Sequence, residues 1–97
     1  MFTYKQAEEK LNAKSKIKLC HETWLEYVDT NCIGIRYHKT YVVKMYPDGT
    51  YELNNGGYLT KTTKERINEY APISLYQKNF CWYYGNGQEF SNGMVVR

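Results

Sequence analysis

The chain has 97 residues, 24% charged and 42% hydrophobic, which is enough for one folded domain and too short for two. This composition is that of a globular domain and excludes a disordered chain. A net charge of +3, from 13 basic and 10 acidic residues, permits weak attraction to polyanions without requiring it.

Tyrosine is unusually frequent, with 11 residues among the 97. Tyrosine favours strands and gives a binding surface a large, rigid amphipathic ring. The sequence therefore points to a β-rich domain in which some of these rings take part in binding.

The three cysteines, Cys20, Cys32 and Cys81, are odd in number, and their spacing matches no zinc-binding pattern. We expect reduced thiols in a cytosolic protein that holds neither a metal nor a cofactor. No apolar run is long enough for a signal peptide or a membrane span, so we expect no membrane partner.

The first residues of the chain predict a short helix. Thr3 and Gln6 have the spacing of a capping box, in which each side chain accepts a hydrogen bond from the other's backbone N–H group. The residues that form one apolar helical stripe are Tyr4, Ala7 and Leu11. Because a helix this short needs tertiary contacts, we expect it to end around Ala13 and to pack on a sheet.

Alternating apolar residues then predict three strands, over residues 16–20, 23–28 and 32–37. Gly34, inside the third strand, indicates a bulge or a close approach of another group to the backbone. Residues 38–40 are expected to turn the chain back.

A β-hairpin is the clearest feature of the sequence. Its turn is Pro47-Asp48-Gly49, with glycine at the position that needs a positive φ, and residues 50–53 form the returning strand. Strict alternation assigns the residues of the first strand to two faces: Tyr41, Val43 and Met45 to a mostly apolar face, and Val42, Lys44 and Tyr46 to a mixed face.

After the hairpin, residues 54–57 break the pattern, and Thr62 and Glu65 fit a second capping box. These residues predict a helix over about residues 63–70, which Pro72 ends.

The tail returns to strands, over residues 74–77, 80–84, 88–90 and 94–96, with a turn at Lys78-Asn79. The predicted fold class is α+β. It has an N-terminal helix, a mostly antiparallel twisted sheet of about six strands and one short helix in the middle of a single domain.

Residues 24–96 resemble a small-protein family that is common in bacteriophage genomes. The motifs that carry the resemblance are Tyr46-Pro47-Asp48-Gly49-Thr50, Leu53-Asn54-Asn55-Gly56-Gly57-Tyr58 and Thr62-Thr63-Lys64-Glu65-Arg66-Ile67-Asn68. The resemblance implies a phage origin, the cytoplasm of the infected bacterial host as location, and an accessory role such as countering host defence. It assigns no chemistry, and residues 3–20 lie outside it.

The segment before the second helix is a candidate site for a phosphate or a nucleotide. Glycines next to a helix N-terminus, with hydroxyl and ammonium groups nearby, favour anions. The candidate residues are Gly56, Gly57, Thr60, Lys61, Thr62, Thr63 and Lys64. Their spacing is not that of a P-loop, and the alternative is a loop followed by a helix cap.

Catalysis is not expected from this sequence. Cys20 and His21 are neighbours, so in a strand their side chains would point to opposite faces, whereas a nucleophile and its base must lie within hydrogen-bond reach. His38 is expected to be a turn residue. We therefore name no catalytic residue.

The aromatic residues allow a stacking platform for single-stranded nucleic acid, flanked by Arg36, Lys39 and Lys44. Its members would be Tyr41, Tyr46, Tyr51, Tyr58, Phe80, Trp82, Tyr83 and Tyr84. The alternative is that these rings form the core and cross-strand pairs.

The leading hypothesis is a non-enzymatic phage accessory protein that binds and inhibits a bacterial defence protein or ribonucleoprotein, as anti-CRISPR proteins do. The candidate contact residues are Glu22, Glu26, Asp29, Arg36, Tyr41, Tyr46, Tyr58, Trp82 and Tyr84. The alternatives are a module that binds single-stranded nucleic acid and a sponge that sequesters a nucleotide signal at residues 56–64. The identity of the partner and the oligomeric state stay open.

Overall fold

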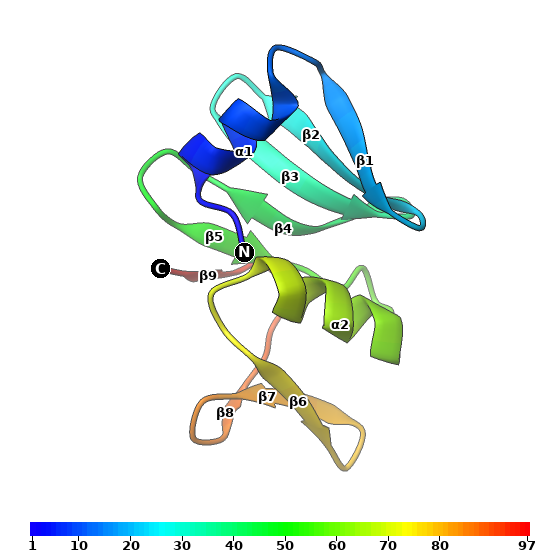
Figure 1. Ribbon diagram of the computed structural model, residues 1–97. Helices are drawn as coiled ribbons and strands as arrows, with labels where there is room; N and C mark the ends of the chain where they lie inside the picture. Colours follow the sequence, from blue (N-terminus) through cyan, green and yellow to red (C-terminus); the bar gives the residue numbers. More distant parts are fainter.

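The computed structural model describes residues 1–97 as an α+β domain, as predicted (Figure 1). Its elements in chain order are α1 (Tyr4–Leu11), β1 (Lys16–Cys20), β2 (Thr23–Asp29), β3 (Cys32–Tyr37), β4 (Thr40–Met45), β5 (Tyr51–Leu53), α2 (Lys61–Tyr70), β6 (Leu75–Lys78), β7 (Cys81–Tyr84), β8 (Gln88–Glu89) and β9 (Met94–Val96). No helix is long and apolar enough to cross a membrane.

The strands form two antiparallel sheets. A six-stranded sheet has the order β1-β2-β3-β4-β5-β9, and strands β6, β7 and β8 form a separate three-stranded sheet. The chain therefore leaves the first sheet after β5 and returns to it only with its last strand. The second sheet lies beyond α2 at one end of the molecule (Figure 1).

Both helices pack on the same face of the six-stranded sheet. The strand register aligns Leu25, Ile35, Val43 and Leu53 across four strands, and all of them are fully buried. The helix residues that join this core are Ala7 and Leu11 from α1 and Ile67 and Tyr70 from α2. Figure 1 shows α1 in front of β2 and β3, while α2 contacts β4 on one side and β6 on the other. The opposite face of the sheet has no helix.

The N-terminal capping box is confirmed. The backbone N–H of Gln6 donates to the Thr3 hydroxyl over 3.1 Å, and the Thr3 N–H donates to the Gln6 side chain over 3.0 Å. The helix ends at Leu11 rather than around Ala13, because Asn12 takes the left-handed conformation with φ 49°.

Strict alternation is wrong at the start of β4. Ile35 pairs with Val43 and Arg36 pairs with Tyr41, so Val42 is an extra residue between two ladder partners, which is a β-bulge. As a result Val42 and Val43 are both fully buried in the core. Tyr41 lies on the opposite face from Val43 instead of beside it.

Gly34 provides the close approach that the sequence predicts. A Cβ atom on this glycine would lie 2.6 Å from Cδ1 of Tyr41, which is closer than van der Waals contact allows. The tyrosine ring therefore rests on the bare backbone of β3, in space that any other residue would fill.

The second sheet differs from prediction by one residue at its first turn. The turn is Asn79-Phe80 rather than Lys78-Asn79, so β7 begins at Cys81. Asn79 has φ 52° and Phe80 has φ 65°, and a two-residue hairpin of this kind needs positive φ at both positions. Phenylalanine seldom takes this conformation, so the sequence pattern favoured placing Phe80 in the strand.

The central hairpin is confirmed, with Gly49 at φ +90° and open space where a side chain would project. We predict that Gly49→Val lowers the free energy of unfolding by about 1–3 kcal/mol, because a β-branched residue is strained at this φ. Thermal and urea denaturation measure the loss. Gly49→Asn, the control, should lose less because asparagine tolerates positive φ. An unchanged melting temperature for Gly49→Val would contradict the assigned turn.

Candidate binding surfaces

The face of the six-stranded sheet without helices is lined by polar and aromatic side chains. We call it the open face. It includes Lys16, Lys18, Trp24, Glu26, Arg36, Tyr41, Lys44, Tyr46 and Glu52, which the strand register and the bulge place on one side. None of these side chains is fully buried, so all of them are accessible in part. Glu26, Arg36, Tyr41 and Tyr46 are brought together here as sequence-predicted contact residues.

Glu26 holds the centre of the open face in one arrangement. Arg36 binds its carboxylate through two hydrogen bonds, Nε to Oε1 at 2.9 Å and Nη2 to Oε2 at 3.2 Å. The Tyr41 hydroxyl donates to the same carboxylate over 2.7 Å. Such charge-assisted, bidentate contacts are geometrically specific. The three side chains therefore hold one another in place.

The titration behaviour of this cluster agrees with its geometry. Partial burial raises the pKa of Glu26, but hydrogen bonds from Arg36 and Tyr41 outweigh it and hold the pKa below its usual value. Burial, together with the hydrogen bond to Glu26, raises the pKa of Tyr41 to about 12. At neutral pH the carboxylate is charged and the phenol is protonated.

Trp24 is the residue that the sequence reasoning missed on this face. Three cationic groups lie over or beside its ring: Lys16 Nζ at 5.2 Å, Lys18 Nζ at 5.9 Å and Arg36 Cζ at 5.9 Å from the ring centroid. These are cation–π distances. The available signal was that Trp24 and Glu26 are two residues apart in a strand and so share a face.

A second cluster surrounds the buried Cys32. The Tyr46 hydroxyl lies 3.2 Å from Glu52 Oε1, and Lys44 Nζ lies 3.8 Å from Glu52 Oε2. Burial is the main cause that raises the pKa of Cys32 and of Tyr46, so both stay protonated at neutral pH. Cys32 is only 1% exposed, which leaves it without access to reagents.

The other predicted contact residues lie elsewhere. Glu22, in the β1–β2 turn, faces His38 at 3.6 Å, and Asp29 accepts a hydrogen bond from the backbone of Asn31 at the far end of β2. Tyr84 is half-buried in the second sheet. Trp82 is only 3% exposed, so its prediction as a contact residue is wrong.

A single platform of eight aromatic side chains does not exist. Trp82 packs against Phe90 with ring centroids 5.4 Å apart, and Tyr51 is 6% exposed on the helix side of the sheet. The two sheets separate the remaining rings. The structure therefore favours core and cross-strand packing for Tyr51, Trp82, Tyr83 and Tyr84. Tyr58 and Phe80 are exposed and lie away from the open face.

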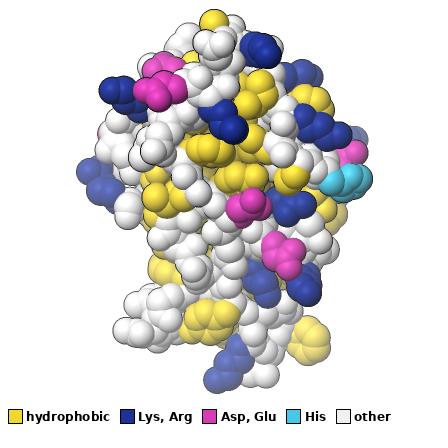
Figure 2. Space-filling model, viewed as in Figure 1, with side chains coloured by type: hydrophobic (Ala, Val, Ile, Leu, Met, Phe, Trp, Pro, Cys, Tyr) yellow, Lys and Arg dark blue, Asp and Glu magenta, His cyan; other side chains and the backbone are white.

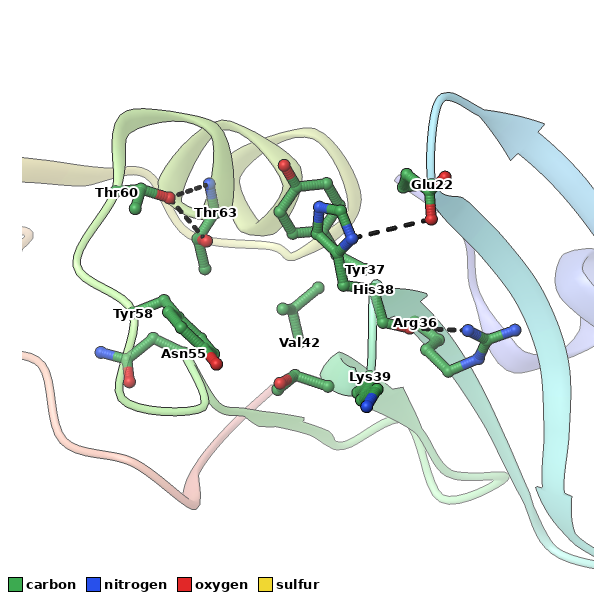
Figure 3. A pocket seen from close by; sticks show the side chains of 11 residues that line it. Glu22, Arg36, Tyr37, His38, Lys39, Val42, Asn55, Tyr58, Thr60 and Thr63 are labelled. Carbon is green, nitrogen blue, oxygen red and sulfur yellow. Dashed lines mark hydrogen bonds and ion pairs between the residues drawn. The ribbon is translucent and has the colours of Figure 1, made fainter.

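A cavity of about 680 Å³ lies between the β3–β4 turn and the loop that precedes α2 (Figure 3). Its lining residues are Glu22, Arg36, Tyr37, His38, Lys39, Thr40, Val42, Asn55, Tyr58, Thr60 and Thr63. Figure 3 shows Thr60 and Thr63 on one side, Tyr58 and Asn55 below them, and His38 and Lys39 across the space.

Of the seven predicted anion-binding residues, only Thr60 and Thr63 line this cavity. Gly56 lies against Thr40, where a Cβ would collide with the Thr40 side chain. The other five, Gly56, Gly57, Lys61, Thr62 and Lys64, do not line it. Lys61 is 85% exposed and lies 4.0 Å from Glu65. The structure thus does not gather these lysines around a common point.

The second capping box is wrong, because α2 begins earlier than predicted. Thr60 is the N-cap, its hydroxyl accepts from the Thr63 N–H over 3.2 Å, and the two hydroxyl oxygens lie 2.8 Å apart. Thr63 is 2% exposed, so the cap is also part of the packing. Two threonines, Thr60 and Thr62, have a spacing suitable for an N-cap. The burial of Thr63 favours Thr60.

The fold and its uncovered sheet face define a small α+β domain with a pre-ordered polar and aromatic surface. The family model described as Kyanoviridae Gp96 protein matches residues 3–97, and the chain belongs to this family of phage proteins. No curated protein and no solved structure matches the chain significantly. The match includes residues 3–20, so the interpretation that this segment lies outside the family is wrong.

We predict that Thr60→Ala lowers the free energy of unfolding by about 1 kcal/mol, because the Thr63 N–H loses its acceptor. Thr62→Ala is the matched control and should change stability little, since Thr62 makes no hydrogen bond of this kind. Chemical denaturation of both variants measures the difference. A larger loss of stability for Thr62→Ala than for Thr60→Ala would instead support the capping box of Thr62 and Glu65.

Proposed function

We propose that this phage accessory protein binds a protein of the infected bacterial cell and thereby inhibits a defence component in its cytoplasm. The observation that carries the proposal is the open face, where Trp24, Arg36 and Tyr41 are partly exposed and already ordered. Tryptophan, tyrosine and arginine are the residue types that dominate the binding energy of protein interfaces. Membership of a phage family supports an accessory role.

Pre-ordering matters because it lowers the entropy lost on binding. Arg36 is held by Glu26 and also donates to the backbone carbonyl of His38 over 2.6 Å, so its long side chain has little freedom left. An interface that uses such fixed groups retains more of its contact energy as affinity.

The charges of the open face indicate the kind of surface that fits it. Glu26 is paired with Arg36 and Glu52 with Lys44, whereas Lys16 and Lys18 have no carboxylate within ion-pair distance. The unpaired charge at the β1 edge is therefore positive. A partner with an acidic patch complements it, and opposite charges accelerate association.

The test is whether the protein restores the plating of a phage that the host defence system restricts. We expect Lys16→Glu/Lys18→Glu to reduce this restoration about tenfold or more, because both charges on the β1 edge reverse. Lys5→Glu/Lys61→Glu, exposed positions on the helices, is the matched control and should retain it. No restoration by the wild-type protein would contradict inhibition, and equal loss in both variants would indicate a general charge effect.

The alternative ligand for the same face is single-stranded nucleic acid, since Trp24 offers a ring next to cations. Two unpaired lysines neutralise few phosphates, however, and Glu26 and Glu52 lie on the same surface. Fluorescence anisotropy with a labelled oligonucleotide distinguishes the two. Salt-sensitive submicromolar binding would favour nucleic acid over a protein as the partner of the open face.

The cavity near α2 supports a second candidate function, the sequestration of a nucleotide. Its volume of about 680 Å³ lies in the range of small-molecule sites, and it offers Arg36 and Lys39 as cations and the Tyr58 ring for stacking. For this function, Lys39→Ala should abolish the heat of nucleotide binding in calorimetric titration. Lys61→Ala/Lys64→Ala, outside the cavity, should leave it unchanged. No heat from wild-type protein with cyclic or linear nucleotides would remove this candidate.

A further inference from the structure

The turn between β6 and β7 contains a residue that the fold alone does not favour. Asn79 and Phe80 join Lys78 to Cys81 directly, and both have positive φ. Turns of this type strongly prefer asparagine or aspartate followed by glycine. Asn79 meets that preference, whereas Phe80, at φ 65°, places a bulky side chain in the left-handed region where L-residues are strained.

Burial of the side chain does not offset the backbone strain at Phe80. It is 86% exposed, the highest value among the large hydrophobic side chains of the chain. The β6–β7 turn projects from the second sheet at the end of the molecule away from α1 (Figure 1). Strained residues that persist in a fold cluster at functional positions.

Further apolar surface lies beside the turn. Leu59, which is 51% exposed, and Phe80 line a small cleft of about 180 Å³. Figure 2 shows hydrophobic side chains at this lower end of the molecule, over the second sheet. The ring therefore projects from a partly apolar base rather than from a fully solvated loop.

We propose that Phe80 is an anchor residue that inserts into an apolar pocket of a partner protein. A convex tip requires a concave receptor, and an aromatic ring in a desolvated pocket is a typical hot spot of protein interfaces. This goes beyond the proposed function, because the contact lies on the second sheet and does not require the partner to be a defence component.

A bilayer is a poorer match for this tip. Membrane-binding segments combine several apolar residues with a cluster of cations, and stable anchoring needs more than one weak signal. The turn offers one phenyl ring and one cation, Lys78, with Glu89 on the neighbouring strand. A protein pocket, by contrast, adds a rim that excludes water around the single ring.

The first measurement separates a functional ring from a structural one. Phe80→Gly and Phe80→Asn should raise the melting temperature by about 2–5 °C, because both residues accept the left-handed conformation. Asn79→Gly is the matched control, since it changes the same turn and keeps the ring. A lower melting temperature for both Phe80 variants would show that the ring supports the fold and would overturn the proposal.

The second measurement uses clarified lysate of the phage host as the probe and the tagged, full-length protein as bait. We expect a host protein that is retained by the wild type and by Asn79→Gly but lost with both Phe80 variants. Titration calorimetry with that purified protein should show binding about 30-fold weaker for Phe80→Gly, the loss typical of a hot spot. Equal capture by all baits, or none by the wild type, overturns the proposal.

Two further experiments test whether Phe80 contacts something other than a partner protein. Co-sedimentation with phosphatidylcholine–phosphatidylglycerol vesicles that depends on Phe80 would assign the tip to membranes. A dimer in analytical ultracentrifugation that dissociates in Phe80→Gly would assign it to a second copy of the chain. Either result overturns the partner-protein assignment. A Phe80-dependent partner unrelated to defence leaves this inference intact and contradicts only the proposed function.

Discussion

The bulge at Val42 is the constraint on which the rest of the structure depends. One extra residue in β4 lets Val42 and Val43 both enter the core, so the helix side of the sheet gains a second buried side chain at this level. The same extra residue turns Tyr41 to the other face, where its ring covers Gly34 and its hydroxyl reaches Glu26. Bulges commonly re-aim a side chain in this way. One backbone irregularity thus shapes both the core and the open face.

The open face shows how a mostly polar surface can be ordered without a covering layer. Glu26 joins Arg36 and Tyr41, and Arg36 in turn lies near the Trp24 ring, so each group limits the freedom of the next. Arginine keeps its charge while stacking on an aromatic ring, which lysine does less well. The arrangement stays accessible because no helix packs on this side, and that combination of order and access is what a binding surface needs.

The two ends of the molecule differ in how stability is distributed. The six-stranded sheet carries both helices and nearly all of the fully buried residues. The second sheet is small, contains the strained Phe80 and includes the buried Trp82, whose indole N–H has no hydrogen-bond partner. Natural proteins tolerate such local costs where the rest of the fold is stable enough to hold them.

Local sequence signals sufficed for most elements, because caps, turns and alternation act over a few residues. The Thr3–Gln6 cap, strands β1 to β3, the Pro47-Asp48-Gly49 turn and the α+β class follow from such patterns alone. Family membership over residues 3–97 extends the phage resemblance that the motifs indicate.

Only the tertiary structure decided which side chains share a surface. A bulge shifts alternation by one residue, and no local pattern marked Val42 as the extra residue, so Tyr41 was assigned to the wrong face. The burial of Trp82, the choice of Thr60 as the cap and the position of Trp24 among three cations depend on packing between different strands and helices. Such packing overrides local preference, because the free energy of burial exceeds the small differences among alternative local conformations.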